Sequence, residues 1–516
     1  MASRRQLSLC TVLGVALASI TATAGAQTLA REKVAAALPA LEAMARQAID
    51  TRAVPGLAIA VVHDDEVVYV KGFGVREAGK PEPVDADTVF QIASLSKSVS
   101  STVVALLVSK DVVGWDSRIA DLDPAFRLHD AFPTAHVTVR DLFSHRSGLP
   151  GTAGDDLEDI GFGREEVLRR LRLVPATSSF RAGYSYSNAG LTQGAVAAAK
   201  PTGKVWEAVA EERLYRRLGM ASTSSRYADF LGRSNRAALH MKADGAWVAR
   251  VKRDPGVQSP AGGVSSSARD LTQWMRLELA GGKHNGEQLI TATAFEQSHV
   301  PLVARGHNPV TGGVSFYGQG WNVEFGRHGM TWGHAGAFSV GGRTVVTLYP
   351  KARLGILVLC NAFPTGVPEG LSDSFADLVF NGRIEKDWMK PWDALYGGLF
   401  GPALEAAKAT YAAPPAPSTA ALPPAAYTGR YTNAYVGDAV IADRNGALTL
   451  SVGPGGARSY ALRHFDRDVF LAFPSPEIPD MPSSVRFAIG PDGKASDVTI
   501  EWLNDWGLGT LKRAGP

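Results

Sequence analysis

The first candidate for chemistry in this 516-residue sequence is a serine followed three positions later by a lysine. The segment Ser94-Leu95-Ser96-Lys97 follows a strand-like stretch, Val89–Ile92, and opens an apolar helix. A spacing of three residues puts Ser94 and Lys97 on the same face of a helix. A serine hydroxyl becomes a nucleophile when a nearby base takes its proton, and a desolvated lysine with a lowered pKa can be that base. A helix-capping serine with a solvated lysine would show the same pattern, so the pair needs support from elsewhere in the chain.

A second pattern, Tyr186-Ser187-Asn188, follows a loop-like stretch. A tyrosine between cationic groups can share their protons and act as an acid or a base. An asparagine offers both a donor and an acceptor, and can hold a lysine or a substrate amide. Surface loops often contain these residue types, so this triplet also needs support.

The third pattern is Trp332–Ala337, which contains His334 and Gly336 and precedes a β-branched strand. A glycine-rich strand edge lets a substrate backbone approach closely, and it can direct a backbone N–H at a developing oxyanion. A single histidine on a strand is more often structural than catalytic.

Taken in chain order, Ser-x-x-Lys, Tyr-x-Asn and His-x-Gly resemble the serine β-lactamase and penicillin-binding-protein superfamily. The resemblance is to its class C-like branch, which contains esterases and D-amino-acid peptidases, and it covers roughly residues 35–380. Three further stretches resemble family motifs: Asp141–Leu149 (DLFSHRSGL), Pro260–Leu271 (PAGGVSSSARDL) and Tyr317–Trp321 (YGQGW).

The resemblance implies a role for each matched residue. Ser94 would be the acylated nucleophile, with Lys97 and Tyr186 as the proton-transfer pair. The backbone N–H groups of Ser94 and Ala337 would form the oxyanion hole. The residues that would bind substrate are Asn188, His334, Gly336 and Ala337.

One position departs from the β-lactamases. Class C β-lactamases and many penicillin-binding proteins carry Lys-Thr-Gly where this chain has His334-Ala335-Gly336. A mostly neutral histidine would hold a β-lactam carboxylate poorly. His-x-Gly resembles the version found in D-aminopeptidases and related peptidases or esterases. Arg146, where the family usually has threonine, is a smaller departure.

These features predict a serine hydrolase that forms an acyl-enzyme on Ser94 and cleaves amide bonds of short peptides, including peptides with D-residues. The alternatives are a carboxylesterase or weak β-lactamase, and a sensor that binds peptidoglycan fragments without turnover. We expect no cofactor and no metal, because the 11 histidines form no His-Glu-x-x-His pattern and no close Cys/His cluster. The expected partner is a small peptide or ester substrate. A net charge of +3 gives no electrostatic reason to expect nucleic acid.

The elements that must position these residues suggest one antiparallel sheet built from both ends of the chain. Apolar residues at helical spacing predict a helix over 31–50, and two β-rich runs, 57–62 and 67–75, follow it. Later strands are predicted at Phe316–Phe325, Ser339–Tyr349 and Gly355–Asn361. Together with the resemblance, this pattern predicts an α/β (α+β) β-lactamase-like fold, with helices and a helical subdomain flanking the sheet.

The first 26 residues are typical of an export signal. Arg4-Arg5 precedes a mostly apolar stretch, 7–20, and Ala24-Gly25-Ala26 is a small-residue cleavage site. Cleavage after Ala26 predicts a periplasmic or secreted protein with no stable membrane anchor. It also leaves Cys360 as the sole cysteine, which therefore cannot form an intramolecular disulfide and is expected to be a buried core thiol.

A Pro/Ala-rich stretch marks the clearest domain boundary. We expect a β-lactamase-related serine hydrolase domain over 27–384, a helix and Pro/Ala-rich linker over 385–421, and a small all-β barrel over 422–516. The last segment resembles, by texture and position, the lipocalin-like domain that follows some of these catalytic domains, and an oligomer could form through it. Five aromatic residues there are predicted to form the barrel core: Phe465, Phe470, Phe473, Trp502 and Trp506.

Overall fold

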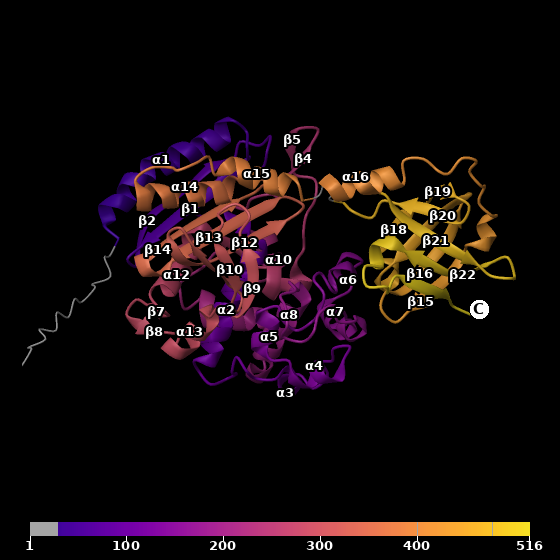
Figure 1. Ribbon diagram of the computed structural model, residues 1–516, viewed down its shortest axis with the longest axis horizontal. Helices are drawn as coiled ribbons and strands as arrows, with labels where there is room; N and C mark the ends of the chain where they lie inside the picture. Colours follow the sequence, from indigo (N-terminus) through magenta and orange to yellow (C-terminus); the bar gives the residue numbers. More distant parts are fainter. Residues whose placement is uncertain (1–28, 400, 477, 516) are drawn as a thin grey trace, which may run out of the picture.

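The structure, a computed structural model, describes residues 29–399, 401–476 and 478–515. A large N-terminal domain and a smaller C-terminal β-domain lie side by side, connected by a segment that contains α15 (Met389–Gly397) and α16 (Gly401–Thr410) (Figure 1). The expected export signal, residues 1–26, lies outside the described residues. In the part of the chain described, no helix has the length and apolar character needed to span a membrane.

An eight-stranded antiparallel sheet forms the centre of the N-terminal domain, in the order β2-β1-β14-β13-β12-β11-β10-β9. Its strands are β1 (Gly56–His63), β2 (Glu66–Gly74), β9 (Val303–His307), β10 (Val314–Tyr317), β11 (Asn322–Gly326), β12 (Gly329–Phe338), β13 (Gly342–Tyr349) and β14 (Leu354–Cys360). Strands from the two ends of the domain meet where β1 pairs with β14, for example at Ala58 and Leu359. The predicted sheet built from both ends of the chain is therefore confirmed.

Helices cover both faces of this sheet (Figure 1). Alternate residues of β1 point to opposite faces. Ile59 packs in the core formed with α1 (Arg31–Asp50) and α14 (Val367–Asn381), whereas Ala60 packs in the core that contains α2 (Ser96–Val108) and α12 (Ala268–Leu279). Because both faces are covered, all eight residues of β1 are buried, which explains its nearly continuous apolar sequence.

A mainly helical region connects β2 to β9, as predicted. Its helices are α2 (Ser96–Val108), α3 (Ile119–Leu122), α4 (Ala131–His136), α5 (Val139–Phe143), α6 (Asp155–Asp159), α7 (Arg164–Arg170), α8 (Asn188–Ala199), α9 (Trp206–Ala210), α10 (Tyr227–Gly232), α11 (Ser259–Gly262), α12 (Ala268–Leu279) and α13 (Ala292–His299). Three short strand pairs interrupt it: β3 (Val89–Gln91) with β6 (Ser265–Ser267), β4 (Met241–Ala243) with β5 (Ala246–Val248), and β7 (Lys283–His284) with β8 (Glu287–Gln288).

The prediction of one continuous strand over 316–325 is wrong. The chain turns at Gly318–Trp321, so that β10 and β11 form an antiparallel pair. Gly320 has a φ of +82°, and a Cβ added there would lie 2.6 Å from the carbonyl oxygen of Lys97. The turn therefore needs a glycine both for its backbone conformation and for its close approach to α2. The prediction of a strand from Ser339 also began too early, because residues 339–341 form the turn before β13.

The C-terminal domain is a nine-stranded antiparallel sheet in the order β18-β17-β16-β15-β23-β22-β21-β20-β19, which confirms the expected small all-β domain. Its strands are β15 (Gly429–Asn433), β16 (Gly437–Arg444), β17 (Ala447–Val452), β18 (Arg458–Ala461), β19 (Arg463–Asp466), β20 (Val469–Ala472), β21 (Ser483–Ile489), β22 (Ala495–Ile500) and β23 (Thr510–Arg513). β18 and β19 are consecutive in the chain but lie at opposite ends of the strand order.

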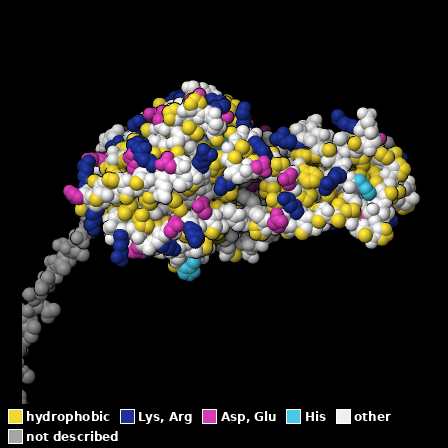
Figure 2. Space-filling view, turned by 90° about the horizontal axis from the view of Figure 1, so that it is seen from above, with side chains coloured by type: hydrophobic (Ala, Val, Ile, Leu, Met, Phe, Trp, Pro, Cys, Tyr) yellow, Lys and Arg dark blue, Asp and Glu magenta, His cyan; other side chains and the backbone are white. Residues whose placement is uncertain are grey.

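The C-terminal domain packs against α6 and α7 of the N-terminal domain (Figure 1). The Tyr435 hydroxyl lies 2.6 Å from Oδ1 of Asp156, and the main-chain oxygen of Tyr435 accepts a hydrogen bond from Arg170. Gly453 approaches the main chain of Ile160 so closely that a Cβ would collide with the carbonyl oxygen. Charged side chains of both signs are interspersed over the face of the molecule shown in Figure 2.

Candidate active site

Ser94 lies in the short 3₁₀ turn Ala93–Leu95, and Lys97 lies in the first turn of α2. The Lys97 side chain is fully buried. Its Nζ lies 3.1 Å from the Ser94 hydroxyl, 2.7 Å from Oδ1 of Asn188 and 2.9 Å from the carbonyl oxygen of Ala261. This geometry rules out a solvated lysine behind a capping serine.

Burial lowers the pKa of Lys97 from its ordinary value to about 7, and the nearby Asp155 carboxylate opposes that shift only in part. A lysine with such a pKa is neutral in a substantial fraction of molecules near neutral pH. Its lone pair then lies within hydrogen-bonding distance of the Ser94 hydroxyl. Lys97 can therefore act as the base that activates Ser94.

Tyr186 differs from Lys97 in the proton chemistry that it can perform. Burial raises the pKa of Tyr186 well above its ordinary value, although a hydrogen bond with Ser94 acts in the opposite direction. The Lys97 ammonium lies over the Tyr186 ring, 4.5 Å from its centroid. Tyr186 therefore stays protonated and can donate a proton or a hydrogen bond, whereas Lys97 is the group that can accept one.

The loop that carries Tyr186 is held by the segment 141–149. The main-chain N–H of Ser185 donates to the carbonyl oxygen of His145 (2.8 Å), and the N–H of Ser187 donates to Nδ1 of the same histidine (3.1 Å). The His145 ring lies 4.5 Å from the Tyr186 ring, centroid to centroid. Burial lowers the pKa of His145 well below its ordinary value, so its ring is neutral and Nδ1 is free to accept. His145 thus holds the loop that carries Tyr186 through its carbonyl oxygen and its ring.

The fully buried carboxylate of Asp141 holds the same loop in place through two ion pairs. Its Oδ1 lies 2.8 Å from Nε of Arg146, and its Oδ2 lies 2.8 Å from a terminal nitrogen of Arg181. The main-chain N–H of Arg181 donates to the carbonyl oxygen of Arg146 at 2.8 Å. Arg146, the departure from the family pattern, therefore shares one carboxylate with the arginine at the start of the Tyr186 loop.

The strand β12 brings His334, Gly336 and Ala337 to the site. It pairs with β13 over most of its length but with β11 only up to Gly333, which leaves the edge after Gly333 facing the Ser94 turn. A Cβ on Gly336 would lie 2.9 Å from the backbone nitrogen of Leu95. The Ala337 side chain packs instead against the cluster formed by Phe363, Trp392 and Tyr396 on the opposite face of the sheet. Ala337 can therefore serve the site only through its backbone.

His334 is buried, and its hydrogen bonds fix its tautomer. Nδ1 lies 2.7 Å from the carbonyl oxygen of Ala335, which can only accept, so Nδ1 carries the proton. Nε2 consequently accepts from the Tyr317 hydroxyl at 2.9 Å. Burial, assisted by the charge of Lys97, lowers the pKa of His334 to about 3. The side chain at this position is therefore neutral at physiological pH.

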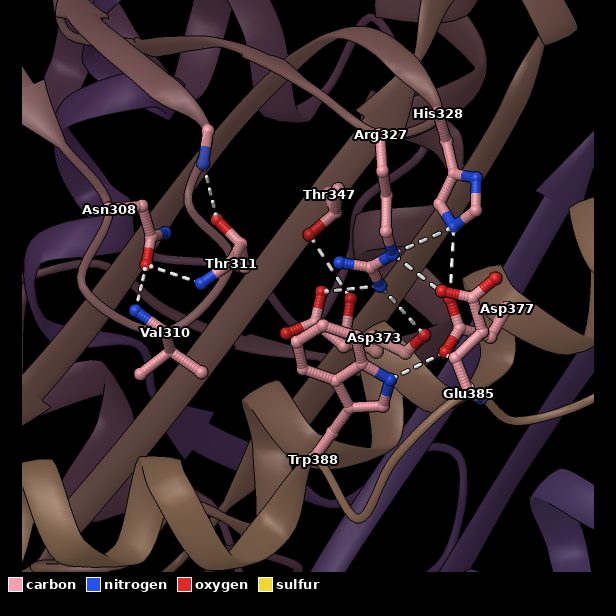
Figure 3. A network of polar contacts seen from close by, with 12 residues as sticks. Asn308, Val310, Thr311, Arg327, His328, Thr347, Asp373, Asp377, Glu385 and Trp388 are labelled. Atoms are coloured by element: carbon pink, nitrogen blue, oxygen red, sulfur yellow. Dashed lines mark hydrogen bonds and ion pairs between the residues drawn. The ribbon is translucent and has the colours of Figure 1, made fainter.

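A polar network on the opposite face of the sheet anchors the start of β12 (Figure 3). Arg327, in the turn between β11 and β12, donates to the buried Asp377 of α14 at 2.9 Å. His328 also lies 3.1 Å from that carboxylate, and the indole N–H of Trp388 donates to it at 2.6 Å. These contacts hold the start of β12 in position against α14. They therefore help to fix the distance between the free edge of β12 and Ser94.

Two polar residues of the site, Asp155 and Gln258, were not identified from the sequence. Oδ2 of Asp155 accepts from Asn188 at 3.1 Å, and its Oδ1 accepts from Gln258 at 2.9 Å. Asp155 belongs to the acidic run Asp155–Asp159, which has the appearance of a solvated helix start, and no spacing rule connects it to Asn188. Among the described residues, no group of three or more His, Cys, Asp or Glu side chains is placed to hold a metal ion.

Comparison with known proteins gives several relatives, which match between about a third and nine tenths of the chain. An unguisins hydrolase of Aspergillus campestris is 25% identical over 480 residues, covering 89% of this chain and 88% of that protein. The D-alanyl-D-alanine-carboxypeptidase/endopeptidase AmpH of Escherichia coli is 23% identical over 63% of this chain and 84% of its own length. Esterase EstB of Burkholderia gladioli is 32% identical over 199 residues, covering 35% of this chain and 49% of that protein.

Solved structures show the same fold. An octameric penicillin-binding protein homologue from Pyrococcus abyssi matches with a TM-score of 0.56 at 18% identity, covering 90% of this chain and 98% of that one. A family model described as a domain of unknown function, DUF3471, matches residues 413–509. The beta-lactamase family model matches residues 41–379, which include Ser94, Lys97, Tyr186, Asn188 and the whole of β12. The chain belongs to the beta-lactamase family and is a serine hydrolase.

Proposed function

We propose that this protein cleaves amide bonds of short peptides through an acyl-enzyme on Ser94. The observation that carries the proposal is the buried Lys97, whose Nζ lies 3.1 Å from the Ser94 hydroxyl and whose pKa burial lowers to about 7. Such a lysine has little value for stability, because burying a charged amine is costly. A lysine that can be neutral and lies beside the hydroxyl is, however, what a serine needs in order to act as a nucleophile.

In this mechanism Lys97 takes the Ser94 proton as Oγ attacks the substrate carbonyl carbon. The resulting oxyanion accepts hydrogen bonds from the backbone N–H groups of Ser94 and Ala337. Collapse of the tetrahedral intermediate breaks the C–N bond, and the leaving nitrogen receives the proton held by Lys97, relayed by the Tyr186 hydroxyl. Water then attacks the ester on Ser94, Lys97 again acts as the base, and the acid product leaves with the serine regenerated.

The neutral His334 supports a peptide rather than a β-lactam substrate. A β-lactam carries a carboxylate that a cationic side chain would hold, and His334 has no charge at physiological pH, since its pKa is about 3. Two of the relatives, the unguisins hydrolase and AmpH, have names that indicate hydrolysis, in the second case of peptides. The likeness to Esterase EstB supports a second candidate, hydrolysis of small acyl esters. We further propose that residues 1–26 direct export to the periplasm or the exterior.

The test is a substrate panel applied to the full chain and to Ser94→Ala. The panel contains D- and L-aminoacyl amides, short peptides, nitrophenyl esters and a chromogenic β-lactam. We expect amide hydrolysis and labelling by a fluorophosphonate in the native protein, and neither in Ser94→Ala. Ser179→Ala, an exposed serine in the Tyr186 loop, is the control and should keep both. Ester turnover with peptides untouched would favour the esterase, and acylation without turnover would overturn both candidates.

A further inference from the structure

A cavity of about 1390 Å³ lies between the N-terminal domain and the C-terminal β-domain. It is lined on one side by α6 and the residues that follow it, and on the other side by loops of the β-domain. Asp155 lines the cavity and also accepts a hydrogen bond from Asn188, which in turn contacts Lys97. The cavity therefore opens within two hydrogen bonds of the proposed base, although the catalytic geometry described above does not use it.

Acidic side chains outnumber basic ones around this cavity. The acidic residues are Asp155, Asp156, Glu158, Asp159, Asp254 and Asp505. The basic residues are Arg164, Lys252, Arg253 and Arg458. Arg164 is paired outside the acidic set, with Glu207 at 2.6 Å. Acidic groups therefore predominate around the cavity.

Glu158 supplies an acceptor that the protein does not use. It is 6% exposed and lines the cavity. Its Oε2 lies 3.0 Å from Arg253 and 2.5 Å from Nε2 of Gln258. Its Oε1 is buried and has no hydrogen-bond partner among the residues that the structure describes. A buried carboxylate oxygen without a donor is costly, so Glu158 has an unmet demand for a hydrogen-bond donor at the wall of the cavity.

The opposite wall of the cavity is aromatic. Tyr460, Phe473, Trp502 and Trp506 of the β-domain line it, and Phe473 is 39% exposed. Phe470, by contrast, is buried in the domain core as expected. Trp502 and Trp506 are partly buried and pack against that core, whereas Phe465 and Phe473 do not belong to it, so the expectation that all five C-terminal aromatic residues form the core is wrong for these last two. Faces of such rings attract cations.

We propose that this cavity binds an ammonium group carried by the substrate, held between the acidic side of α6 and the aromatic wall of the β-domain. The inference rests on the proposed function, since it names the substrate class of the same site. Burial raises the pKa of Asp156 to about 6 and that of Glu158 to about 7, as expected for carboxylates that lack sufficient positive charge nearby. A bound ammonium would supply that charge.

The experiment compares 4-nitroanilides of ω-amino acids of increasing chain length with their N-acetylated counterparts at mildly alkaline pH. The full chain should prefer the ammonium form by about tenfold in kcat/KM at the best chain length, as for a charge-assisted hydrogen bond. The preference should fall in high salt. Glu158→Gln, which keeps the shape and removes the charge, should lose most of it. Glu405→Gln, an exposed acid on α16 away from the cavity, should not.

Trp506→Ala provides a second variant, because it alters the aromatic wall and leaves the acidic side intact. A preference that is absent, or that both Glu158→Gln and Trp506→Ala retain, would overturn the inference while leaving the proposed function in place. If no anilide is hydrolysed, the binding of the same compounds to Ser94→Ala, measured by calorimetry, tests separately whether the cavity holds the ammonium group. Tighter binding of the ammonium form there would support the cavity although the amide-cleaving function had failed, and equal binding would overturn it.

Discussion

Lys97 has to be buried beside Ser94 and yet be able to lose its proton. Burial accomplishes both, because the surroundings that hold the side chain also disfavour its charge and lower its pKa to about 7. The three neighbours within hydrogen-bonding distance, Ser94, Asn188 and Ala261, direct Nζ at the serine. The cost is a lower stability of the fold whenever the Lys97 side chain is protonated.

The pH dependence of acylation follows from this pKa. Only neutral Lys97 can accept the Ser94 proton, so kcat/KM should fall about tenfold per pH unit below about pH 7 and level off above it. His334, with its pKa of about 3, should add no inflection near neutrality. The measurement is a pH profile on an uncharged substrate. A profile that is flat through pH 7 would show that Lys97 is not the base.

Lys97→Met should abolish hydrolysis and raise stability. The folded-state pKa of about 7 lies below the ordinary 10.5, so the unfolded chain binds more protons between those values. Native stability therefore rises with pH across that interval, and below it the full cost of the buried charge remains. Removing the amine should raise the free energy of unfolding by roughly 1–3 kcal/mol near pH 6, with the unpaired Asn188 limiting the gain.

The comparison for that stability measurement is Lys110→Met, which replaces an exposed lysine just after α2. It should change neither activity nor the denaturant midpoint appreciably. A Lys97→Met protein that unfolds at lower denaturant concentration than the native one would mean that the hydrogen bonds of Nζ outweigh the cost of its burial.

His334→Lys tests the specificity expected from the sequence. A lysine there would present a charge to a β-lactam carboxylate, so penicillin hydrolysis should rise from negligible by about tenfold or more. Activity on the best uncharged substrate should fall, because Tyr317 loses its acceptor and a second cation approaches Lys97. The measurement is kcat/KM of both forms on both substrates. Efficient penicillin hydrolysis by the native protein would refute this account of His334.

At the scale of elements, the sequence was sufficient where local pattern and spacing carry the information. The apolar strands β1 and β14, the helix α1 and the start of α2 all follow from residue types. The place of Asp155 in the site and the free edge of β12 do not follow from residue types. Both depend on which loops lie next to each other in the folded protein. The break at Gly320 was missed for a similar reason, since its glycine serves a contact with Lys97, more than 200 residues earlier in the chain.

The loop that carries Tyr186 gives a prediction at this scale. Arg181 fixes the start of the loop through Asp141, so Arg181→Ala should let Tyr186 move and lower kcat by about tenfold with a smaller effect on KM. Arg169→Ala removes a comparable ion pair, with Glu166 on α7, and should leave kcat unchanged. The measurement is steady-state kinetics on the same substrate. Equal kinetics for the two variants would show that the ion pair with Asp141 does not position the tyrosine.

At the scale of the whole molecule, the two domains meet through a few contacts that set the width of the cavity between them. Tyr435 contacts both Asp156 and Arg170, and Arg458 donates to the main-chain oxygen of Asp159 at 3.0 Å. These contacts gather on α6 and α7, and α6 also supplies Asp155. The position of the β-domain and the acidic side of the cavity are thus built on the same short helix.

Gly453→Ala should separate catalysis from substrate selection. A Cβ at this position would collide with the carbonyl oxygen of Ile160, so the β-domain must shift away from α6. Gly446→Ala is a matched control, because Gly446 also lies in a β-domain turn at positive φ but has open space around it. Gly453, with φ 81° and ψ 177°, lies in a backbone region that is essentially reserved for glycine, so its alanine variant carries extra strain, and the comparison therefore uses a ratio of two substrates within each variant, from which a general loss of folded protein cancels.

With Gly453→Ala, turnover of an uncharged substrate should stay close to that of the native protein, because Ser94, Lys97 and Tyr186 all lie in the N-terminal domain. The preference for an ammonium-bearing substrate should fall severalfold, because the aromatic wall moves away from Glu158. The measurement is the ratio of kcat/KM for the ammonium and N-acetylated anilides in the two variants. If the two alanine variants give the same ratio, the position of the β-domain takes no part in choosing the substrate.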